Sequence, residues 1–244
     1  MINIVIPMAG AGSRFSQAGY SKPKPFIDVD GKPMIVRVLE NLAYPQARYL
    51  LVARKEHMDA ESDLVRQIEK EFNAVFIPID ALTEGTACTV LYARQYINND
   101  APLLIANSDQ IVDMHIADFI DDCSQRQLNG SILTFVDEHR DPKWSFAKLG
   151  ADGLVTEVQE KRAISEFATV GVYFYTHGAD FVDAAIDMFI ARDRVNNEYY
   201  TCPTYNYLIR AGRHIGIFNI PMSAMHGIGT PEDLSIYLAQ RNDV

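Results

Sequence analysis

The sequence predicts an α/β fold with three α/β/α layers around a mixed, mainly parallel sheet, and a β-rich lobe in its second half. Three observations lead to this prediction. Up to about residue 130, short apolar runs typical of buried strands alternate with segments of helical periodicity, as in parallel sheets. Polar residues directly follow the apolar runs, where open α/β sheets bind ligands. Beyond residue 130, strand-like runs dominate.

The first half is expected to contain four strands joined by helices. The opening run Ile2–Pro7 is apolar until its proline, and Pro33 stands in the first turn of a segment with apolar residues at helical spacing. The predicted strands are 2–7, 49–53, 74–78 and 102–106, and the predicted helices are 33–42, 60–72 and 84–96.

The second half is expected to form a substrate-covering lobe. Asp152-Gly153 predicts a hairpin turn, and Thr230 is a suitable cap for a last helix with two acids in its first turn. Because no linker or repeat separates the halves, we expect one domain over residues 1–244. The predicted strands are 130–136, 146–149, 154–158, 169–175 and 214–219, and the predicted helices are 179–191, 205–210 and 231–240.

Composition limits the function. With 244 residues and 48% hydrophobic content, the chain can bury a large core. The net charge of −10 disfavours binding to nucleic acid or to an anionic membrane. No apolar run reaches 18 residues and no basic leader precedes the first strand, so we expect a cytoplasmic protein. Cys88, Cys123 and Cys202 are far apart and odd in number, which predicts free thiols. The sequence permits a homo-oligomer but holds no sign of one.

The stretch after the first strand has the composition of a phosphate-binding loop. Gly10 and Gly12 lack a Cβ, so the backbone there can approach a phosphate closely. Arg14 offers a planar fork of donors, and Lys22 and Lys24 add point charges between prolines. A Gly-x-Gly pair alone is more typical of a plain turn, and the cations that follow favour a nucleotide-phosphate loop.

Two common phosphate loops do not fit. The dinucleotide fingerprint needs a third glycine where this chain has Phe15. The loop of ATPases and GTPases needs Gly-Lys-Ser/Thr, whereas Gly12 is followed by Ser13-Arg14.

The loop instead resembles that of the sugar-phosphate nucleotidylyltransferases, which have a Rossmann-like nucleotide-diphospho-sugar transferase fold. The similar residues are Ala9-Gly10-Ala11-Gly12-Ser13-Arg14-Phe15, Pro23-Lys24 and Gly31-Lys32-Pro33-Met34-Ile35. The resemblance implies that Ala9, Gly10 and Gly12 bind the nucleotide and that Arg14 and Lys24 are catalytic.

Asp109 is the strongest candidate metal ligand. It directly follows the predicted strand 102–106, at a strand end where one carboxylate and substrate phosphates can hold a hard cation. A solvated turn aspartate is the competing interpretation. Asn107-Ser108-Asp109 is similar to the family's metal-binding context, which implies Mg²⁺ as the cofactor. Asp113 could lie just outside the ligands that contact the metal, but we favour the interpretation that it caps the helix that begins at His115.

Three further motifs resemble those of the family. Gly85-Thr86 is similar to its base-contacting Gly-Thr pair, although a simple helix start is equally compatible. Glu160-Lys161 resembles the pair that engages the sugar phosphate, although exposed Glu-Lys pairs are usually solvated. Gly171 resembles the glycine that leaves room for the acceptor, or is a bulge glycine.

One position departs from the family. Gly229-Thr230-Pro231-Glu232-Asp233 matches its last motif, but the second metal-binding aspartate, expected two residues earlier, is Gly227. Either Asp109 is the single protein carboxylate on the metal, or Asp113 or Glu198 supplies another. The number of metal ions stays open.

The resemblance covers residues 2–233 and implies Mg²⁺-dependent nucleotidyl transfer from a nucleoside triphosphate to a sugar 1-phosphate or similar small phosphate. Pyrophosphate is released, and the product is an activated nucleotide-linked precursor for surface polysaccharide. Residues 1–130 would bind the nucleotide and 131–244 the acceptor. No histidine has a Ser-His-Asp or Cys-His partner at motif spacing. A glycosyltransferase using a nucleotide sugar and a non-catalytic nucleotide-sensing module are the alternatives.

Overall fold

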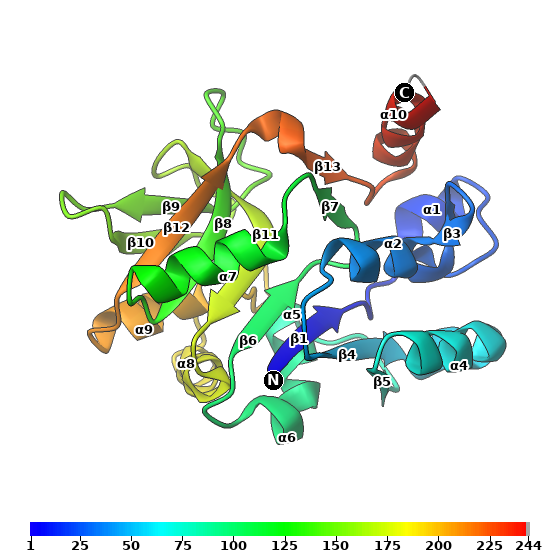
Figure 1. Cartoon of the computed structure of the whole chain (residues 1–244), viewed down its shortest axis with the longest axis horizontal. Coiled ribbons are helices and arrows are strands. Elements are labelled where there is room, and N and C mark those ends of the chain that lie inside the picture. Colours follow the sequence, from blue (N-terminus) through cyan, green and yellow to red (C-terminus); the bar gives the residue numbers. More distant parts are fainter. Residues whose placement is uncertain (243–244) are drawn as a thin grey trace.

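The computed structural model describes residues 1–242, which fold around a sheet of nine strands flanked by helices (Figure 1). Four neighbouring strands of the first half run parallel in the order β6-β1-β4-β5. These strands are β1 (Ile2–Pro7), β4 (Ala47–Arg54), β5 (Ala74–Ile79) and β6 (Leu103–Ala106). The predicted α/β fold with a mainly parallel sheet is confirmed.

The second half extends the same sheet through one long strand. β11 (Phe167–Tyr175) is antiparallel to β6 and to β8 (Gly130–Val136), and β8 is parallel to β12 (Ile215–Ile220). The hairpin of β9 (Phe146–Leu149) and β10 (Val155–Gln159) joins the far end of β11. The sheet therefore continues across the predicted halves without a break.

Helices cover both faces of the sheet and create two large apolar clusters. Ile4 and Ile6 of β1 belong to one cluster and Val5 to the other, because successive side chains of a strand point to opposite faces. The first cluster includes α2 (Met34–Asn41), α4 (Ser62–Glu71) and α7 (Ile116–Gln125), and the second includes α5 (Thr86–Val90), α8 (Gly178–Ile190) and α9 (Thr204–Arg210). β1 is buried on both faces, which explains its continuous apolar run.

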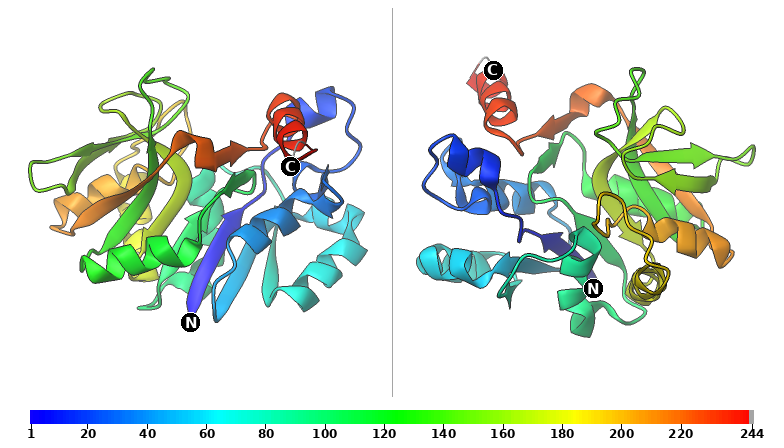
Figure 2. Two further views of the ribbon diagram at one scale, coloured as in Figure 1. Left: turned by 45° about the horizontal axis from the view of Figure 1, so that its top comes forward. Right: turned by 180° about the vertical axis from the view of Figure 1, so that it is seen from behind.

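A third apolar cluster joins the two ends of the chain. Figure 2 shows the last helix, α10 (Pro231–Asn242), beside the segment that contains α1 (Ser13–Gln17). The cluster contains Phe15, Leu234 and Tyr237, and an ion pair links Arg241 to Asp30. Two short ladders adjoin it: β2 (Asp28–Val29) with β3 (Lys32–Pro33), and β7 (Gln110–Val112) with β13 (Met225–Gly227).

One predicted helix is confirmed with an unpredicted neighbour, and another is interrupted. The helix expected over 60–72 is α4, and α3 (Lys55–Ala60), which was not predicted, precedes it with a break at Glu61. The helix expected over 84–96 begins at Thr86 and consists of α5, a 3₁₀ turn (Leu91–Ala93) and α6 (Arg94–Ile97). Two further 3₁₀ turns cover Lys24–Phe26 and Met222–Ala224. Periodicity alone located these helices but not their breaks.

Smaller expectations can also be compared with the structure. Thr230 caps α10 as predicted, since its hydroxyl accepts a hydrogen bond from the Asp233 N–H at 3.1 Å. Asp113 does not cap α7, because its carboxylate pairs with His226 at 2.7 Å. The three cysteines are free. Within residues 1–242, none of the helices combines the length and apolar character that a membrane crossing requires.

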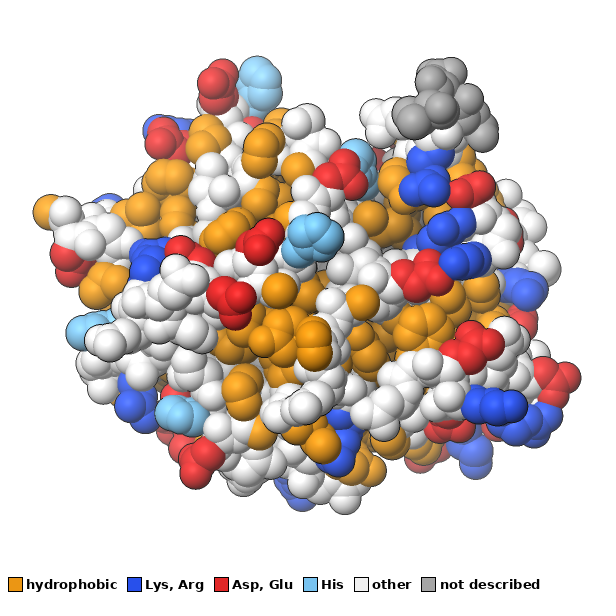
Figure 3. All heavy atoms as spheres, in the orientation of Figure 1, with side chains coloured by type: hydrophobic (Ala, Val, Ile, Leu, Met, Phe, Trp, Pro, Cys, Tyr) orange, Lys and Arg blue, Asp and Glu red, His pale blue; other side chains and the backbone are white. Residues whose placement is uncertain are grey.

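Acidic and basic side chains are interspersed on the face of the molecule drawn in Figure 3. The net charge of −10 is therefore not concentrated in one acidic patch on this face. Local arrangements of charge, as in the cavity described next, determine where an anion can bind.

Candidate active site

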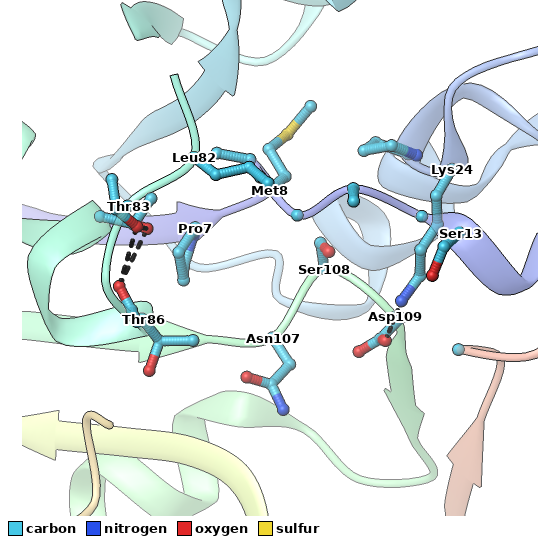
Figure 4. A pocket seen from close by; sticks show the side chains of 18 of the residues that line it. Pro7, Met8, Ser13, Lys24, Leu82, Thr83, Thr86, Asn107, Ser108 and Asp109 are labelled. Atoms are coloured by element: carbon cyan, nitrogen blue, oxygen red, sulfur yellow. Dashed lines mark hydrogen bonds and ion pairs between the residues drawn. The ribbon is translucent and has the colours of Figure 1, made fainter. Parts of the chain in front are cut away.

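A cavity of about 540 Å³ lies beyond the carboxyl ends of β1 and β6 (Figure 4). β1 lies between β4 and β6, so the chain order reverses at this point, where open α/β sheets bind ligands. The lining comprises residues 7–15, Lys24, Pro25, Leu82, Thr83, Gly85, Thr86, Thr89, residues 107–109, Glu198 and Gly229.

The glycine-rich loop forms one wall of the cavity. Gly12 has a φ of 63°, and a Cβ built on it would lie 3.1 Å from the Lys24 Cβ. Glycine is therefore required here for the backbone conformation and for the close approach of the lysine. A Cβ built on Gly10 would meet no atom within 4 Å. Arg14 lines the cavity and is exposed. Phe15, by contrast, is 1% exposed and anchors the loop in the third apolar cluster.

Lys24 and Asp109 meet at one end of the cavity, although 85 residues separate them in sequence. The Lys24 ammonium donates a hydrogen bond to Asp109 Oδ2, and the contact is drawn as a dashed line in Figure 4. The two side chains are 21% and 25% exposed. This partial burial strengthens the electrostatic interaction relative to an exposed pair, while leaving both groups accessible to a ligand.

The donor set around Asp109 fits a magnesium ion that is held largely by its substrate. Among residues 1–242, no group of three or more His, Cys, Asp or Glu side chains could hold a metal. Mg²⁺ is commonly bound through one or two carboxylates plus phosphates and waters, so the Asp109 carboxylate together with substrate phosphates fits such an ion. Asp113 pairs with His226 and does not line the cavity, whereas Glu198 does. Gly227 lies opposite Gln110 in the β7–β13 ladder and offers no donor side chain.

Gly85 and Thr86 line the cavity and also connect the two halves of the chain. Gly85 has a φ of 123°, and a Cβ there would lie 2.6 Å from the Tyr199 backbone nitrogen. The Tyr199 N–H donates to the Glu84 carbonyl at 2.7 Å, and the Thr201 N–H donates to the Thr86 hydroxyl at 3.1 Å. Both residues therefore have a structural role, and the base contact that the resemblance implies for them stays a prediction.

The three predicted acceptor residues are not part of the cavity lining. Glu160 is buried, and its carboxylate accepts a hydrogen bond from the Ser145 hydroxyl. The Lys161 ammonium donates to the Tyr200 hydroxyl at 2.7 Å, two residues beyond Glu198 in the cavity wall. Gly171 is at a β-bulge with a φ of 92°, and its carbonyl accepts a hydrogen bond from the Asn107 N–H at 3.0 Å. These residues thus lie behind or beside the wall.

Several lining residues belong to no sequence motif, although Glu198 was considered as a second metal ligand. Glu198 reaches the wall because Asn196 and Asn197 both have positive φ and fold the chain back after Val195. The hydroxyls of Thr83 and Thr89 lie 2.6 Å apart, and both bond to the Gly85 carbonyl. No motif marks such residues, because their positions depend on the packing of distant segments.

The chain is similar to nucleotidyl transferases. The sequence model of the nucleotidyl transferase family matches residues 4–200. The chain is 25% identical over 232 residues to the UTP--glucose-1-phosphate uridylyltransferase AglF of Haloferax volcanii, which covers 94% of this chain and 92% of AglF. It is 28% identical over 116 residues to the mannose-1-phosphate guanyltransferase of Schizosaccharomyces pombe. That stretch covers 47% of this chain and 32% of the guanyltransferase. It thus spans most of AglF but about a third of the guanyltransferase.

Solved structures share the fold. The nucleoside-diphosphate-sugar pyrophosphorylase from Vibrio cholerae RC9 has a TM-score of 0.80 and 25% identity, with 97% of this chain and 100% of that chain covered. A putative glucose-1-phosphate thymidylyltransferase from Bacillus anthracis has a TM-score of 0.76 and 19% identity, with 100% of this chain and 96% of that chain covered. At this identity, the similarity shows the fold alone.

Proposed function

Because the chain belongs to the nucleotidyl transferase family, we propose that it transfers a nucleotidyl group from a nucleoside triphosphate to a sugar 1-phosphate or a similar small phosphate. Pyrophosphate is the second product. The single observation that carries the proposal is the meeting of Lys24 and Asp109 beside the glycine-rich loop, in a cavity at the reversal of strand order.

The reaction requires little from a general base. A phosphate monoester is largely dianionic at neutral pH because its second pKa is about 6, so one of its oxygens can attack the α-phosphorus directly. The new bond joins the acceptor oxygen to the α-phosphorus, and the bond from the α-phosphorus to the pyrophosphate oxygen breaks. The electron pair leaves with pyrophosphate. This accounts for the absence of a histidine from the cavity lining described above.

Each residue of the site has a proposed role in this reaction. The backbone of residues 9–12 and the Arg14 guanidinium hold the triphosphate, and Lys24 stabilises the charge that develops on the α-phosphoryl oxygens. Asp109 would hold Mg²⁺, which supplies positive charge to the phosphates when bound. Gly85 and Thr86 would lie against the base. Glu160, Lys161 and Gly171 would shape the acceptor side.

The acceptor and the cellular role are also part of the proposal. AglF is named for UTP and glucose 1-phosphate, which supports a hexose 1-phosphate as one acceptor to test. We place nucleotide binding in residues 1–130 and acceptor binding in 131–244, within one domain. The product would be an activated nucleotide-linked precursor for surface polysaccharide, made in the cytoplasm.

The test is a pyrophosphate-release screen of five triphosphates (ATP, CTP, GTP, UTP and dTTP) against a panel of sugar phosphates, polyol phosphates and amine-bearing phosphates. Lys24→Ala and Asp109→Asn should each lower turnover with the best pair by about 100-fold or more, as expected for the loss of a transition-state electrostatic contact. Near-normal turnover of both variants would refute the proposed roles. Sugar transfer without pyrophosphate release would indicate a glycosyltransferase, and triphosphate binding without turnover on any acceptor would indicate a sensing module.

A further inference from the structure

The end of the chain contributes to the candidate active site, although the family match stops at residue 200. β13 pairs with β7, which places Gly227 opposite Gln110, the residue after Asp109. The chain then turns, and the Ile228 N–H donates a hydrogen bond to the Asp109 carbonyl at 2.9 Å. The backbone of Asp109 is therefore tied to a segment that follows it by more than 100 residues.

The next residue, Gly229, lies against the side chain of Asp109. A Cβ built on Gly229 would be 2.5 Å from Asp109 Oδ2, 3.1 Å from its Cγ and 3.5 Å from Lys24 Nζ. Contacts below about 3 Å do not occur for real Cβ atoms, so a side chain here would displace the carboxylate from the lysine. The φ of Gly229 is outside the left-handed region, so the backbone conformation accepts alanine, and the added Cβ would act by moving the Asp109 carboxylate.

The residues on either side of Gly229 are anchored by tertiary contacts. Ile228 is fully buried, and it packs with Leu234 and Phe15 in the third apolar cluster. Thr230 begins α10: its hydroxyl accepts a hydrogen bond from the Asp233 N–H, and its carbonyl accepts one from the Leu234 N–H. The position of Gly229 is thus fixed on one side by Asp109 and on the other by a helix packed on the glycine-rich loop.

We propose that Gly229 is a positioning residue: its missing side chain leaves the space in which the Asp109 carboxylate meets the Lys24 ammonium. The inference deepens the proposed function and rests on it for its kinetic consequence, but the geometric claim can be tested separately. Gly227, two residues earlier, is a matched control, because a Cβ there meets nothing within 4 Å.

The experiment compares Gly229→Ala with Gly227→Ala by two measurements. The first is the rate at which acetic anhydride labels Lys24 in the folded protein, measured by tandem mass spectrometry of peptides that contain Lys24. Loss of its carboxylate partner should make Lys24 label several-fold faster in Gly229→Ala, and at the wild-type rate in Gly227→Ala. The second is turnover, where Gly229→Ala should lower kcat by about 100-fold with a nearly unchanged KM for the triphosphate, since misplacement by about 1 Å can cost that much.

The outcomes separate this inference from the proposed function. If the wild type turns over no acceptor, the proposed function fails, while faster labelling of Lys24 in Gly229→Ala still supports the positioning role. Equal labelling in the two glycine variants overturns it. Should Gly229→Ala unfold, the change is repeated in an Asp109→Ala background, where the added methyl group has room. Recovery of the wild-type melting behaviour supports the inference, and failure to recover overturns it.

Discussion

At the scale of single residues, Glu160 is the clearest case of a group whose chemistry the fold has changed. It is 9% exposed, and burial raises the pKa of its carboxyl above the ordinary value of 4.5. The Ser145 hydroxyl bond and the charge of Lys161 lower the pKa, while the charge of Glu198 raises it. The net direction is upward, so the folded protein holds this proton more tightly than the unfolded chain does.

This raised pKa has a consequence for stability. The stabilisation is fully present below pH 4.5, the unfolded value, and is lost as the pH rises through the folded pKa. Glu160→Gln keeps an acceptor for Ser145 but removes the ionisation. We therefore expect its melting temperature, relative to the wild type, to increase as the pH is raised from 4 to 7. The same change at exposed Glu166 should give no such trend, and parallel curves for the two variants would contradict the prediction.

At the scale of elements, α10 supports the glycine-rich loop from the far end of the chain. Leu234 is 2% exposed and Tyr237 is 6% exposed, and both pack in the cluster that buries Phe15. Phe15 directly follows Arg14, which lines the cavity. The position of the proposed phosphate-binding arginine therefore depends on a helix more than 200 residues away in sequence.

Leu234→Ala should test this dependence. Removal of a fully buried leucine side chain costs about 2–5 kcal/mol of unfolding free energy, and the loosened Phe15 should raise the KM for the triphosphate. Denaturant unfolding and steady-state kinetics measure the two effects. Ile236→Ala, on the same helix but at a side chain that is 53% exposed, should change neither quantity noticeably. A normal KM in a clearly destabilised Leu234→Ala would show that α10 does not support the loop.

At the scale of the whole molecule, the cavity is assembled from both halves of the chain. The first half supplies the loops after β1 and β6, and the second supplies Glu198 and Gly229. A single sheet passes from one half to the other through the β6–β11 pair. A ligand in the cavity should therefore stabilise the molecule as a unit.

This linkage predicts thermal stabilisation by the correct triphosphate with Mg²⁺. At 100 times its Kd, the ligand should add about 2.7 kcal/mol to the free energy of unfolding. For a chain of this length, that corresponds to roughly 5–11 °C in melting temperature. Differential scanning fluorimetry would detect it. The same nucleoside without phosphates should have little effect. The triphosphate should stabilise Arg14→Ala less than the wild type, because the Arg14 guanidinium is proposed to hold the phosphates. Equal stabilisation in those controls would contradict a phosphate-dependent site.

From the sequence alone we predicted all nine strands of the main sheet, but not the short ladders β2–β3 and β7–β13, and we recognised what the opening loop resembles. β8 and β9 have the predicted bounds, because a short run rich in apolar residues is a local pattern that can be read from the sequence. Ala9, Gly10, Gly12, Arg14, Lys24, Gly85, Thr86 and Asp109, all singled out from motifs, line one cavity. Motifs predict such residues because glycine conformations and charge spacing are fixed over a few positions.

Tertiary packing sets how distant segments of the chain meet. It paired Lys24 with Asp109, brought Glu198 and Gly229 into the wall, and placed Glu160, Lys161 and Gly171 outside the lining. It also divided the helix expected over 84–96 into α5, a 3₁₀ turn and α6. The physical reason is the same in each case: these positions depend on contacts across more than one element, and a contact between residues far apart in the chain has no local pattern in the sequence.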